Sequence, residues 1–501
     1  MASISVAGRS TRTQWALIGI LLVSFALYLY GLGAQGLWMD EVITVQRSNM
    51  SLPDMLDDLL ETRNHVPLYF VLMYPWQMGG SSEFWVRFPS VMWAVLGIAV
   101  VGRLALDLRG ARASVLASLL LALSPLYNWH AQDARMYTMV AFWVIAATWA
   151  FLRAWRRGGW GWWVLCGLSV LAAAYTHLLA PIVFVAQAFL VILQRRRNPR
   201  GFSRWFLVVL PAAVLYGVWL IVLANSGGFA TAYTGWIPAP TLVDIPLTYY
   251  VLTVGATAGW QNALTYVPLV VVLALTVWLV ASARRLKWFT RWALNLVGVG
   301  IVVMPLLVWL ASLRQSIYVD RYFLPLVPLL AVWVAIGLDL LWEQRRTVAW
   351  IGLALLLVGD IWSLSNLHFA PRYRRDDWRG AAALIRDRAQ PQDALLAYAY
   401  RPFQHYDIGD LEPVDAWSIM EDPSAYQERT SEVVEGKERL WLVLPLTVLN
   451  NHGFCEERDE LAVYWIDENP YVQWLQSAYG LLEEHRFTGV HLMLLYVGES
   501  K

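Results

Sequence analysis

Cysteine and charged side chains are scarce in this chain. Two cysteines occur in 501 residues, Cys166 in an apolar run and Cys455 in a polar region, so neither a disulfide framework nor a cysteine metal site is supported. Charged residues make up 15% of the chain and hydrophobic residues 58%, which is too apolar for an ordinary soluble enzyme. The net charge of +1 gives no indication of a nucleic-acid partner. The composition predicts a polytopic α-helical membrane protein.

Long apolar runs occupy most of the first 365 residues. A membrane-spanning helix needs about 20 apolar residues, and the sequence offers about eleven candidate runs. The first follows Arg9 and Arg12 without a convincing cleavage site, so we expect an uncleaved signal anchor. A shorter run at 67–78 is expected to be re-entrant or interfacial. The predicted spans are 15–32, 88–108, 113–129, 137–152, 160–178, 179–193, 205–224, 265–282, 293–311, 323–341 and 348–364.

Positive charge alternates between the loops. One set of loops contains clusters such as Arg153, Arg156 and Arg157, whereas the other set is poor in Lys and Arg, and residues 225–261 contain neither. Loops rich in Lys and Arg stay in the cytoplasm. The pattern predicts that the N-terminus is inside and that the chain after Asn366 lies on the extracytoplasmic side.

A change to polar composition after residue 365 divides the chain into two domains. We expect a transmembrane domain at 1–365, with a first outer loop at 33–87 that carries interfacial helices. Residues 366–501 are expected to form a small soluble extracytoplasmic α/β domain. Its expected elements are helices at 378–388 and 471–485 and strands at 394–400, 440–445 and 490–497.

Two adjacent carboxylates, Asp40 and Glu41, follow the first apolar run where the chain leaves the membrane. Charges at such a position are rare unless water covers them or chemistry uses them. Solvated loop charges are the plain alternative. We interpret the pair as the centre of a catalytic site.

Further polar side chains fall in the same outer loops. Arg135 and Arg321 break the scarcity of positive charge there, and guanidinium groups bind phosphate oxygens in pairs. An acid pair beside such arginines is what a transferase using a lipid phosphate needs. A local ion pair with Asp320 is the alternative for Arg321, and plain hydrogen bonding is the alternative for the histidines. The supporting candidates are His65, Asp133, Tyr137, His177 and Tyr322.

Five motifs on the predicted outer face carry a family resemblance. They are Trp38-Met39-Asp40-Glu41, His65-Val66-Pro67-Leu68-Tyr69-Phe70, Glu83-Phe84-Trp85-Val86-Arg87-Phe88-Pro89-Ser90, Gln132-Asp133-Ala134-Arg135-Met136-Tyr137 and Asp320-Arg321-Tyr322-Phe323-Leu324-Pro325. In order and placement they resemble the multispanning glycosyltransferases of the C superfamily (GT-C), in particular the branch with protein O-mannosyltransferases and lipid A aminoarabinose transferases. The likeness covers roughly residues 15–345. Val66 departs from the family's second proline and Asp133 from its glutamate.

The resemblance implies an inverting transfer of a sugar from a polyprenyl-phosphate donor to an acceptor hydroxyl of a glycan, lipid or protein. The site would lie at the extracytoplasmic face of a cell membrane, which we expect to be a bacterial inner membrane. Asp40 would be the general base, and Glu41 a helper that orients it or holds a cation. The cofactor is left open: a divalent cation is one candidate, with Asp40, Glu41 and Asp133 as its ligands.

Other functions stay open at this point. A polyprenyl-diphosphate-dependent glycan polymerase or ligase would need a similar site, and a lipid or sugar transporter would need as many spans. Ion-coupled carriers keep ionisable residues near the bilayer midplane, a pattern that the spans do not show clearly. Aromatic residues in the 227–260 loop, such as Tyr233, Trp236, Tyr249 and Tyr250, are candidates for stacking on a sugar ring.

Overall fold

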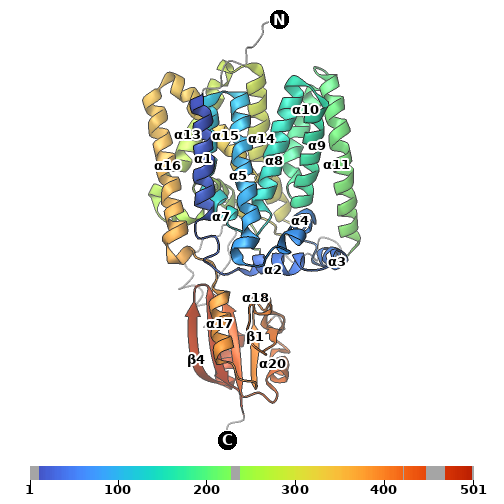
Figure 1. Cartoon of the computed structure of the whole chain (residues 1–501), viewed down its shortest axis with the longest axis vertical. Helices are drawn as coiled ribbons and strands as arrows, with labels where there is room; N and C mark the ends of the chain where they lie inside the picture. Colours follow the sequence, from blue (N-terminus) through green and yellow to red (C-terminus); the bar gives the residue numbers. More distant parts are fainter. Residues whose placement is uncertain (1–10, 227–236, 421, 447–468, 499–501) are drawn as a thin grey trace.

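A bundle of long helices and a smaller sheet domain lie end to end (Figure 1). The computed structural model describes residues 11–226, 237–420, 422–446 and 469–498. Cys455, Tyr233 and Trp236 lie outside the described residues.

Apolar helices matching all of the predicted spans form the bundle. Within the described residues, eight helical segments are long and apolar enough to cross a membrane and three shorter apolar helices accompany them. The predicted fold class is therefore confirmed, and α16 continues to Phe369, past the expected domain boundary. The bundle helices are α1 (Thr11–Leu29), α5 (Glu83–Leu108), α6 (Ala111–Leu123), α8 (Tyr137–Arg157), α9 (Trp160–Thr176), α10 (Pro181–Gln194), α11 (Pro199–Asn225), α13 (Val267–Ser282), α14 (Trp288–Ser312), α15 (Leu326–Gln344) and α16 (Arg346–Phe369).

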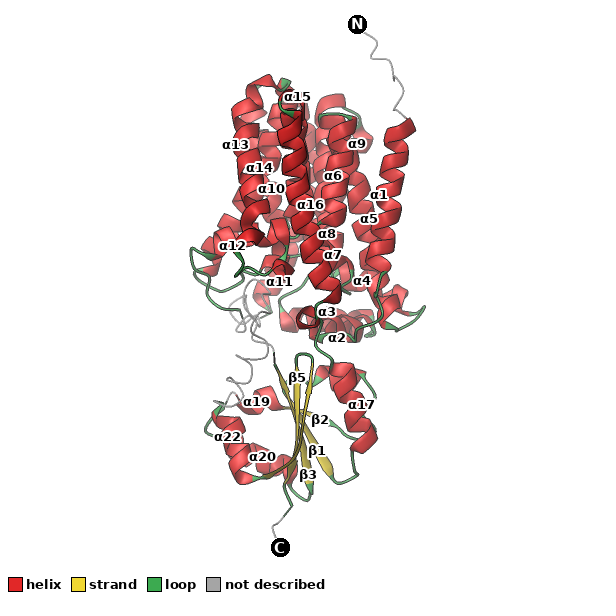
Figure 2. Ribbon diagram, turned by 90° about the vertical axis from the view of Figure 1, so that its left-hand side faces the viewer, coloured by secondary structure: helices red, strands yellow, loops and turns green. Residues whose placement is uncertain are grey.

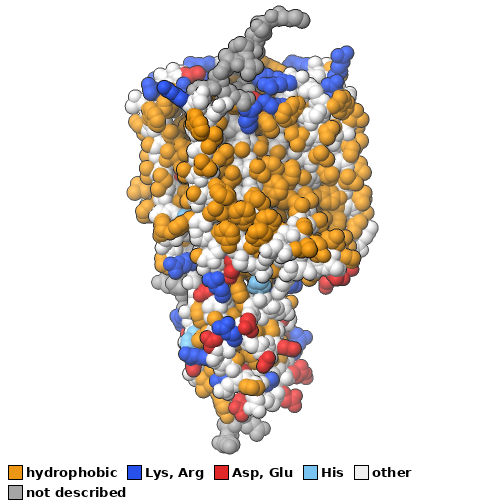
Figure 3. Space-filling view, in the orientation of Figure 1, with side chains coloured by type: hydrophobic (Ala, Val, Ile, Leu, Met, Phe, Trp, Pro, Cys, Tyr) orange, Lys and Arg blue, Asp and Glu red, His pale blue; other side chains and the backbone are white. Residues whose placement is uncertain are grey.

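Burial differs strongly between these helices. In the most apolar 18-residue stretch of each helix, 78% of the residues of α8 and 83% of those of α15 are buried, compared with 11% in α1 and in α11. Large apolar side chains such as Leu22 and Ile221 are exposed on the outer helices, and apolar side chains cover a broad band of the bundle on the face shown in Figure 3. Such a band suits contact with lipid.

Short helices cover the end of the bundle that faces the C-terminal domain. Three of them come from the first outer loop, as expected, and α4 is too short to cross about 30 Å of hydrocarbon at about 1.5 Å per residue. Ser51 caps α3 by accepting a hydrogen bond from the Asp54 amide. These helices are α2 (Met39–Ser48), α3 (Leu52–Thr62), α4 (Leu68–Gln77), α7 (Pro125–Ala131) and α12 (Asp244–Val254), together with the 3-10 turns η2 (Ala256–Ala258), η3 (Ala263–Tyr266) and η5 (Asp320–Phe323).

The C-terminal domain is a mixed five-stranded sheet with helices on both faces (Figure 2). Its strands lie in the order β2-β1-β3-β5-β4, with β1 parallel to β2 and β3, and β5 antiparallel to β3 and β4. Alternate residues of β3 enter two separate cores: Leu442 packs towards α22 and Trp441 towards α17. The elements are η6 (Pro371–Tyr373), α17 (Trp378–Arg388), β1 (Asp393–Ala397), α18 (Arg401–His405), β2 (Pro413–Asp415), α19 (Ala416–Met420), α20 (Tyr426–Val434), β3 (Arg439–Pro445), α22 (Pro470–Ala478), β4 (Gly480–Phe487) and β5 (Val490–Tyr496).

One predicted element of this domain is wrong. The helix expected at 471–485 ends at Ala478, and the chain then forms strand β4. Pairing with β5 satisfies the backbone of β4 and overrides the helical preference of its Leu and Glu residues. The predicted helix at 378–388 and the three predicted strands are confirmed with small shifts at their ends.

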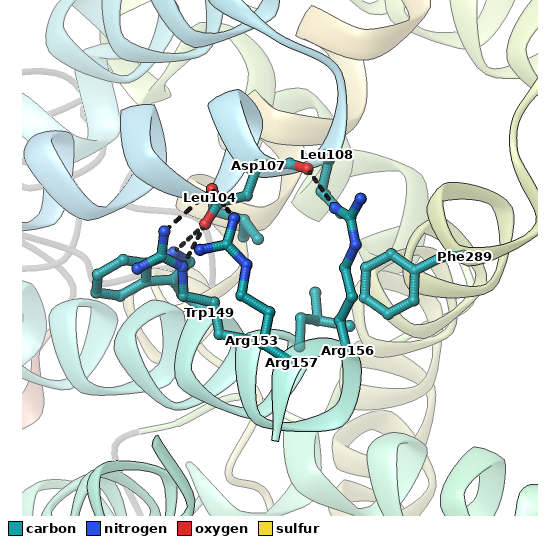
Figure 4. A pocket seen from close by; sticks show the side chains of 9 residues that line it. Leu104, Asp107, Leu108, Trp149, Arg153, Arg156, Arg157 and Phe289 are labelled. Atoms are coloured by element: carbon teal, nitrogen blue, oxygen red, sulfur yellow. Dashed lines mark hydrogen bonds and ion pairs between the residues drawn. The ribbon is translucent and has the colours of Figure 1, made fainter. Parts of the chain in front are cut away.

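Lys and Arg gather at the opposite end of the bundle, near the N-terminus (Figure 3). There Arg153 binds Asp107 through two hydrogen bonds of 2.7 and 3.2 Å, and Arg156 donates to the Asp107 backbone oxygen at 3.2 Å. Figure 4 shows the guanidinium groups of Arg153, Arg156 and Arg157 turned towards Asp107 in a small pocket beside Trp149. We call Asp107 with these three arginines the basic-end cluster.

Candidate active site

Asp40 lies between two arginines at the end of the bundle that faces the C-terminal domain. Its Oδ2 atom is 3.6 Å from Nη2 of Arg321 and 3.8 Å from Nη2 of Arg135. Both distances are too long for a direct hydrogen bond. The Asp40 side chain stays 23% exposed, whereas that of Arg135 is 4% exposed. A carboxylate and two guanidinium groups thus face one another without closing into a tight ion pair.

Partners other than the Asp40 carboxylate hold Arg135 in place. Its Nη1 donates to the backbone oxygen of Asp40 at 3.0 Å and to Oγ1 of Thr44 at 3.2 Å. Its Nη2 lies 2.8 Å from Nε2 of His65. Because a guanidinium can only donate, Nε2 accepts from Arg135, and the Nδ1 proton of His65 then faces the side-chain oxygen of Asn64. Nη1 of Arg47 lies 3.3 Å from the same Nδ1, which cannot accept a hydrogen bond in this tautomer. His65 is therefore a neutral acceptor in this arrangement.

The charge state of His65 follows from its surroundings. Burial, followed by the positive charges of Arg135 and Arg47, lowers the pKa of His65 well below its ordinary value. A neutral imidazole is therefore favoured at physiological pH. His65 contacts the Arg135 guanidinium through Nε2 and so helps to orient it.

Glu41 points away from Asp40 into the protein. Consecutive residues of a helix do not face each other, and α2 directs the Glu41 side chain into a fully buried position. Arg87 binds it with two hydrogen bonds of 2.7 and 2.8 Å, and the Ala134 amide donates to Oε1 at 2.7 Å. Burial on its own would raise the pKa of Glu41, but the charges of Arg375 and Arg87 outweigh burial and hold it below its usual value.

Asp133 is the second buried carboxylate of the site. Its Oδ1 accepts a hydrogen bond from Nε1 of Trp38 at 2.8 Å and lies 2.9 Å from Nη1 of Arg375, and its Oδ2 is 3.0 Å from Nδ1 of His130. Burial would raise the pKa of Asp133, but Arg375 and the contact with His130 lower it below its ordinary range. Asp133 is thus fully engaged by protein partners.

The three candidate cation ligands do not form one cluster of oxygen ligands. Glu41 and Asp133 are bound by arginines, whereas Asp40 faces a different pair of arginines. Among the described residues, no group of three or more His, Cys, Asp or Glu side chains could hold a metal ion. These residues therefore do not fit a divalent cation in this arrangement.

Aromatic rings line the side of the site next to Arg321. The ring of Tyr322 lies 5.0 Å from that of His177 and 6.5 Å from that of Tyr137. The guanidinium of Arg321 lies 5.7 Å from the ring of Trp38. Such rings keep water away from the arginine and strengthen its attraction for an anion.

The structure brings every predicted site residue to one end of the bundle. Asp40, Arg135, Arg321 and His65 form one group, Glu41 and Asp133 a second one beneath it, and Tyr137, Tyr322 and His177 the aromatic side.

Several residues of the site were not singled out by the sequence. Arg87 lies inside one of the quoted motifs but received no role there, although it also donates to the backbone oxygens of Leu32, Gln35 and Gly36. Thr248 donates to Oδ1 of Asp320, next to Arg321, at 2.9 Å. Arg375 and His130 were missed as well, because an arginine in a polar segment and a histidine in a short helix carry no local signal.

Part of this chain matches a known protein family. A family model described as dolichyl-phosphate-mannose-protein mannosyltransferase matches residues 67–222. A comparison with curated protein sequences finds no match. The matched segment contains Arg87, Asp133 and Arg135.

Solved structures with the same fold extend over nearly the whole chain. ArnT from Cupriavidus metallidurans bound to undecaprenyl phosphate aligns over 96% of this chain and 98% of that one, with 13% identity and a TM-score of 0.55. The archaeal oligosaccharyltransferase AglB from Archaeoglobus fulgidus, in complex with an inhibitory peptide and a dolichol-phosphate, aligns over 97% of this chain and 74% of that one, with 11% identity and a TM-score of 0.56. The resemblance to GT-C proteins is confirmed at the level of the fold.

Proposed function

We propose that this protein is an inverting glycosyltransferase that moves a sugar from a polyprenyl-phosphate carrier to an acceptor hydroxyl. The observation that carries the proposal is the Asp40 carboxylate, partly exposed and 3.6 and 3.8 Å from the guanidinium groups of Arg321 and Arg135. The reaction requires a base beside two groups that can bind phosphate, and here the carboxylate makes only long ion-pair contacts with both guanidinium groups. The GT-C fold and the lipid phosphates named for ArnT and AglB support the same substrate class.

The reaction is a single displacement at the anomeric carbon of the sugar. The acceptor oxygen forms its bond to that carbon while the bond from the carbon to the phosphate oxygen breaks, and the configuration inverts. Asp40 takes the hydroxyl proton, a step for which a positioned carboxylate supplies roughly two to four powers of ten in rate. The products are the glycosylated acceptor and the polyprenyl monophosphate.

The leaving group gains one negative charge when the bond breaks, because a phosphodiester becomes a phosphomonoester. Arg135 and Arg321 are placed to neutralise that charge, and their partners hold them before substrate arrives. Glu41 and Asp133 are bound on all sides by the protein, so we assign them a positioning role. A divalent cation is not required by this assignment.

The orientation of the protein in the membrane is part of the proposal. The basic-end cluster and the candidate site lie at opposite ends of the bundle, and Lys and Arg mark the cytoplasmic end of membrane proteins. This charge distribution supports an extracytoplasmic site and C-terminal domain, and we expect the membrane to be a bacterial inner membrane. Labelling of single cysteines at positions 412 and 157 with a membrane-impermeant reagent tests it: only position 412 should react in intact cells.

A transfer assay tests the chemistry. Membranes from a deletion strain that expresses the wild-type chain or Asp40→Asn are given radiolabelled mannosyl-phosphoryl-undecaprenol or its diphosphoryl analogue. We expect the wild type to release sugar from the monophosphate donor and Asp40→Asn to release it roughly two to four powers of ten more slowly. Release from the diphosphate donor alone would favour the polymerase or ligase alternative. Full activity of Asp40→Asn, with the variant inserted and folded, would refute the proposed role of Asp40.

The sugar and the acceptor need a separate experiment. Mannose is the probe because the matching family model names it, and other sugars on the same lipid extend the series. Glycolipid and glycoprotein analysis of the deletion strain, compared with its complemented form, identifies which glycan, lipid or protein loses a sugar.

A further inference from the structure

Arg375 reaches the candidate site from the C-terminal side of the chain. It lies between η6 and α17, in the segment that joins the two domains. Its Nη1 atom is 2.8 Å from Oε1 of Glu41 and 2.9 Å from Oδ1 of Asp133. One guanidinium nitrogen therefore bridges two carboxylates from two different loops of the membrane domain.

The rest of Arg375 is fixed as well. Its Nη2 donates to the backbone oxygen of Gln132 at 2.8 Å, and its backbone amide donates to Oε1 of Gln35 at 2.7 Å. The Arg375 side chain is 12% exposed, and the side chains of Glu41 and Asp133 are fully buried. Arg375 thus contributes to the buried interior of the other domain.

Charge balance explains why this position needs a cation. Glu41 already has Arg87 as a bidentate partner, but the remaining partners of Asp133 are the Trp38 indole and the His130 imidazole. Burial lowers the pKa of His130, so that ring gives a hydrogen bond rather than a full charge. Without Arg375, two carboxylates would be buried next to each other with one arginine between them. Uncompensated buried charge is strongly destabilising.

Each of the two carboxylates lies within two residues of a proposed catalytic or phosphate-binding residue in the sequence. Glu41 is the neighbour of Asp40 in α2, and the Arg135 amide donates to the Asp133 backbone oxygen at 2.7 Å. Holding Glu41 against Asp133 therefore supports the placement of Asp40 relative to Arg135, in addition to the direct hydrogen bonds from Arg135 to the Asp40 backbone oxygen and to Thr44.

We propose that Arg375 is a positioning residue of the transfer reaction. Through it the C-terminal domain holds two parts of the active site against each other: helix α2 with Asp40, and the loop with Asp133 and Arg135. This inference rests on the proposed function. It makes the C-terminal domain part of the catalytic apparatus, in addition to any acceptor that it recognises. Arg375 acts through Glu41 and Asp133 and is not expected to touch substrate.

Arg379 provides a matched control. It also belongs to the C-terminal domain and reaches the membrane domain, with Nη1 3.0 Å from Oε1 of Glu83 and Nη2 donating to the Ala34 backbone oxygen at 2.8 Å. Its partners do not include Glu41 or Asp133, and its side chain is 44% exposed. Arg379→Gln therefore removes an interdomain ion pair without touching the carboxylate bridge.

The experiment compares full-length Arg375→Gln, Arg375→Lys, Arg379→Gln and the double variant Asp133→Asn/Arg375→Gln. Each is purified, reconstituted with mannosyl-phosphoryl-undecaprenol and acceptor membranes, and assayed for kcat, while undecaprenyl phosphate binding is measured separately. We expect Arg375→Gln to lose about 100-fold in kcat, the loss typical of a misplacement of about 1 Å. Binding of undecaprenyl phosphate should change much less, because Arg135 and Arg321 remain, and Arg379→Gln should match the wild type.

The double variant separates charge from bulk. Asp133→Asn removes one of the two repelling charges and supplies an amide that can donate to Glu41, so the double variant should regain about tenfold over Arg375→Gln, a coupling typical of one ion-pair network. Arg375→Lys should keep part of the activity because it keeps the charge. The proposal is overturned if Arg375→Gln turns over like Arg379→Gln, or if the double variant is no better than Arg375→Gln.

A stability measurement keeps the test independent of the assay. In Arg375→Gln the repulsion between Glu41 and Asp133, with Arg87 and His130 as the other ionisable neighbours, should raise the pKa of one carboxyl in the folded state. A carboxyl whose pKa is raised in the folded state contributes stability at low pH, and that contribution is lost as the pH rises. The unfolding midpoint of this variant should therefore decrease as the pH is raised from about 5 to about 8. The double variant should not show that fall. If neither the wild type nor any variant transfers sugar, the proposed function fails. The pH dependence of the unfolding midpoint still decides whether Arg375 bridges Glu41 and Asp133. A midpoint of Arg375→Gln that does not decrease with pH overturns the bridge.

Discussion

Two aspartates, one at each end of the bundle, lie among arginines but are held differently. In the basic-end cluster, Asp107 receives two hydrogen bonds from Arg153 and one of 3.0 Å from Nε1 of Trp149. At the other end, the Asp40 carboxylate stays 3.6 and 3.8 Å from its two arginines, which are held by other partners. The first arrangement is a closed ion pair that stabilises helix packing. The second is a looser arrangement, in which the carboxylate is 23% exposed and makes no close hydrogen bond with either guanidinium.

The strongest test of this difference replaces each aspartate by asparagine. Asp40→Asn should lower transfer by roughly two to four powers of ten, because an amide cannot accept the acceptor proton. Asp107→Asn should leave kcat unchanged. Initial rates in membranes with equal amounts of each variant give the measurement. Equal losses for the two variants would mean that neither aspartate takes part in chemistry directly.

A second comparison concerns the arginines. Arg321→Ala should reduce kcat by about 10²–10³, the loss seen when one group that stabilises developing charge is removed. Arg321→Lys should recover part of it, since a point charge remains but two-point contact with phosphate is lost. Arg153→Ala, at the basic end, is the matched control and should retain transfer. The affinity of Arg321→Ala for undecaprenyl phosphate, measured by thermal shift, should also decrease.

The closed pair should matter for stability instead. Asp107→Asn removes charge-assisted hydrogen bonds and should cost about 1–3 kcal/mol of unfolding free energy. Thermal unfolding of the purified protein in detergent, followed by intrinsic fluorescence, would show this as a lower midpoint. An unchanged midpoint would mean that Arg153 is held chiefly by Trp149 and Trp162, whose rings lie 5.0 and 4.7 Å from its guanidinium.

Mild acid should loosen the candidate site and spare the basic end. The pKa of His65 is lowered in the folded protein, so the unfolded chain takes up a proton first as pH falls. Stability associated with His65 is thus full above about pH 6.5 and falls below it by at most about 1.4 kcal/mol per pH unit. Unfolding midpoints between pH 7.5 and 5.5 measure this. His65→Gln, which can still accept a hydrogen bond from Arg135, should flatten the curve, and an equally steep curve would exclude His65 as its source.

The sequence predicts the bundle well because lipid imposes a simple rule. A span must be a long apolar helix, and loops rich in Arg alternate with loops poor in it. All of the predicted runs recur as helices, including the short α6, α9 and α10. The C-terminal domain follows weaker rules, because strand pairing depends on distant partners. For that reason β4 was interpreted as helix and β2 was not predicted.

The candidate site divides in the same way. The presence of Asp40, Arg135 and Arg321 at one end follows from topology alone, because each lies in or beside a loop of the same set. The direction of each side chain does not. Adjacent Asp40 and Glu41 look equivalent in the sequence, but α2 exposes the first and buries the second. The two arginines that bind Glu41 are Arg87, in a membrane helix, and Arg375, far later in the chain in the segment that joins the two domains. Local sequence patterns do not reveal such partners.

The late position of Arg375 has a consequence for biogenesis. Glu41 and Asp133 are synthesised long before Arg375, and the last membrane helix, α16, has to insert before the Arg375 guanidinium can reach them. Until then the two buried acids have Arg87 as their arginine partner and lack the second positive charge that Arg375 supplies. The proposed site would therefore be completed only after the segment that follows α16 has been synthesised and has folded against the bundle.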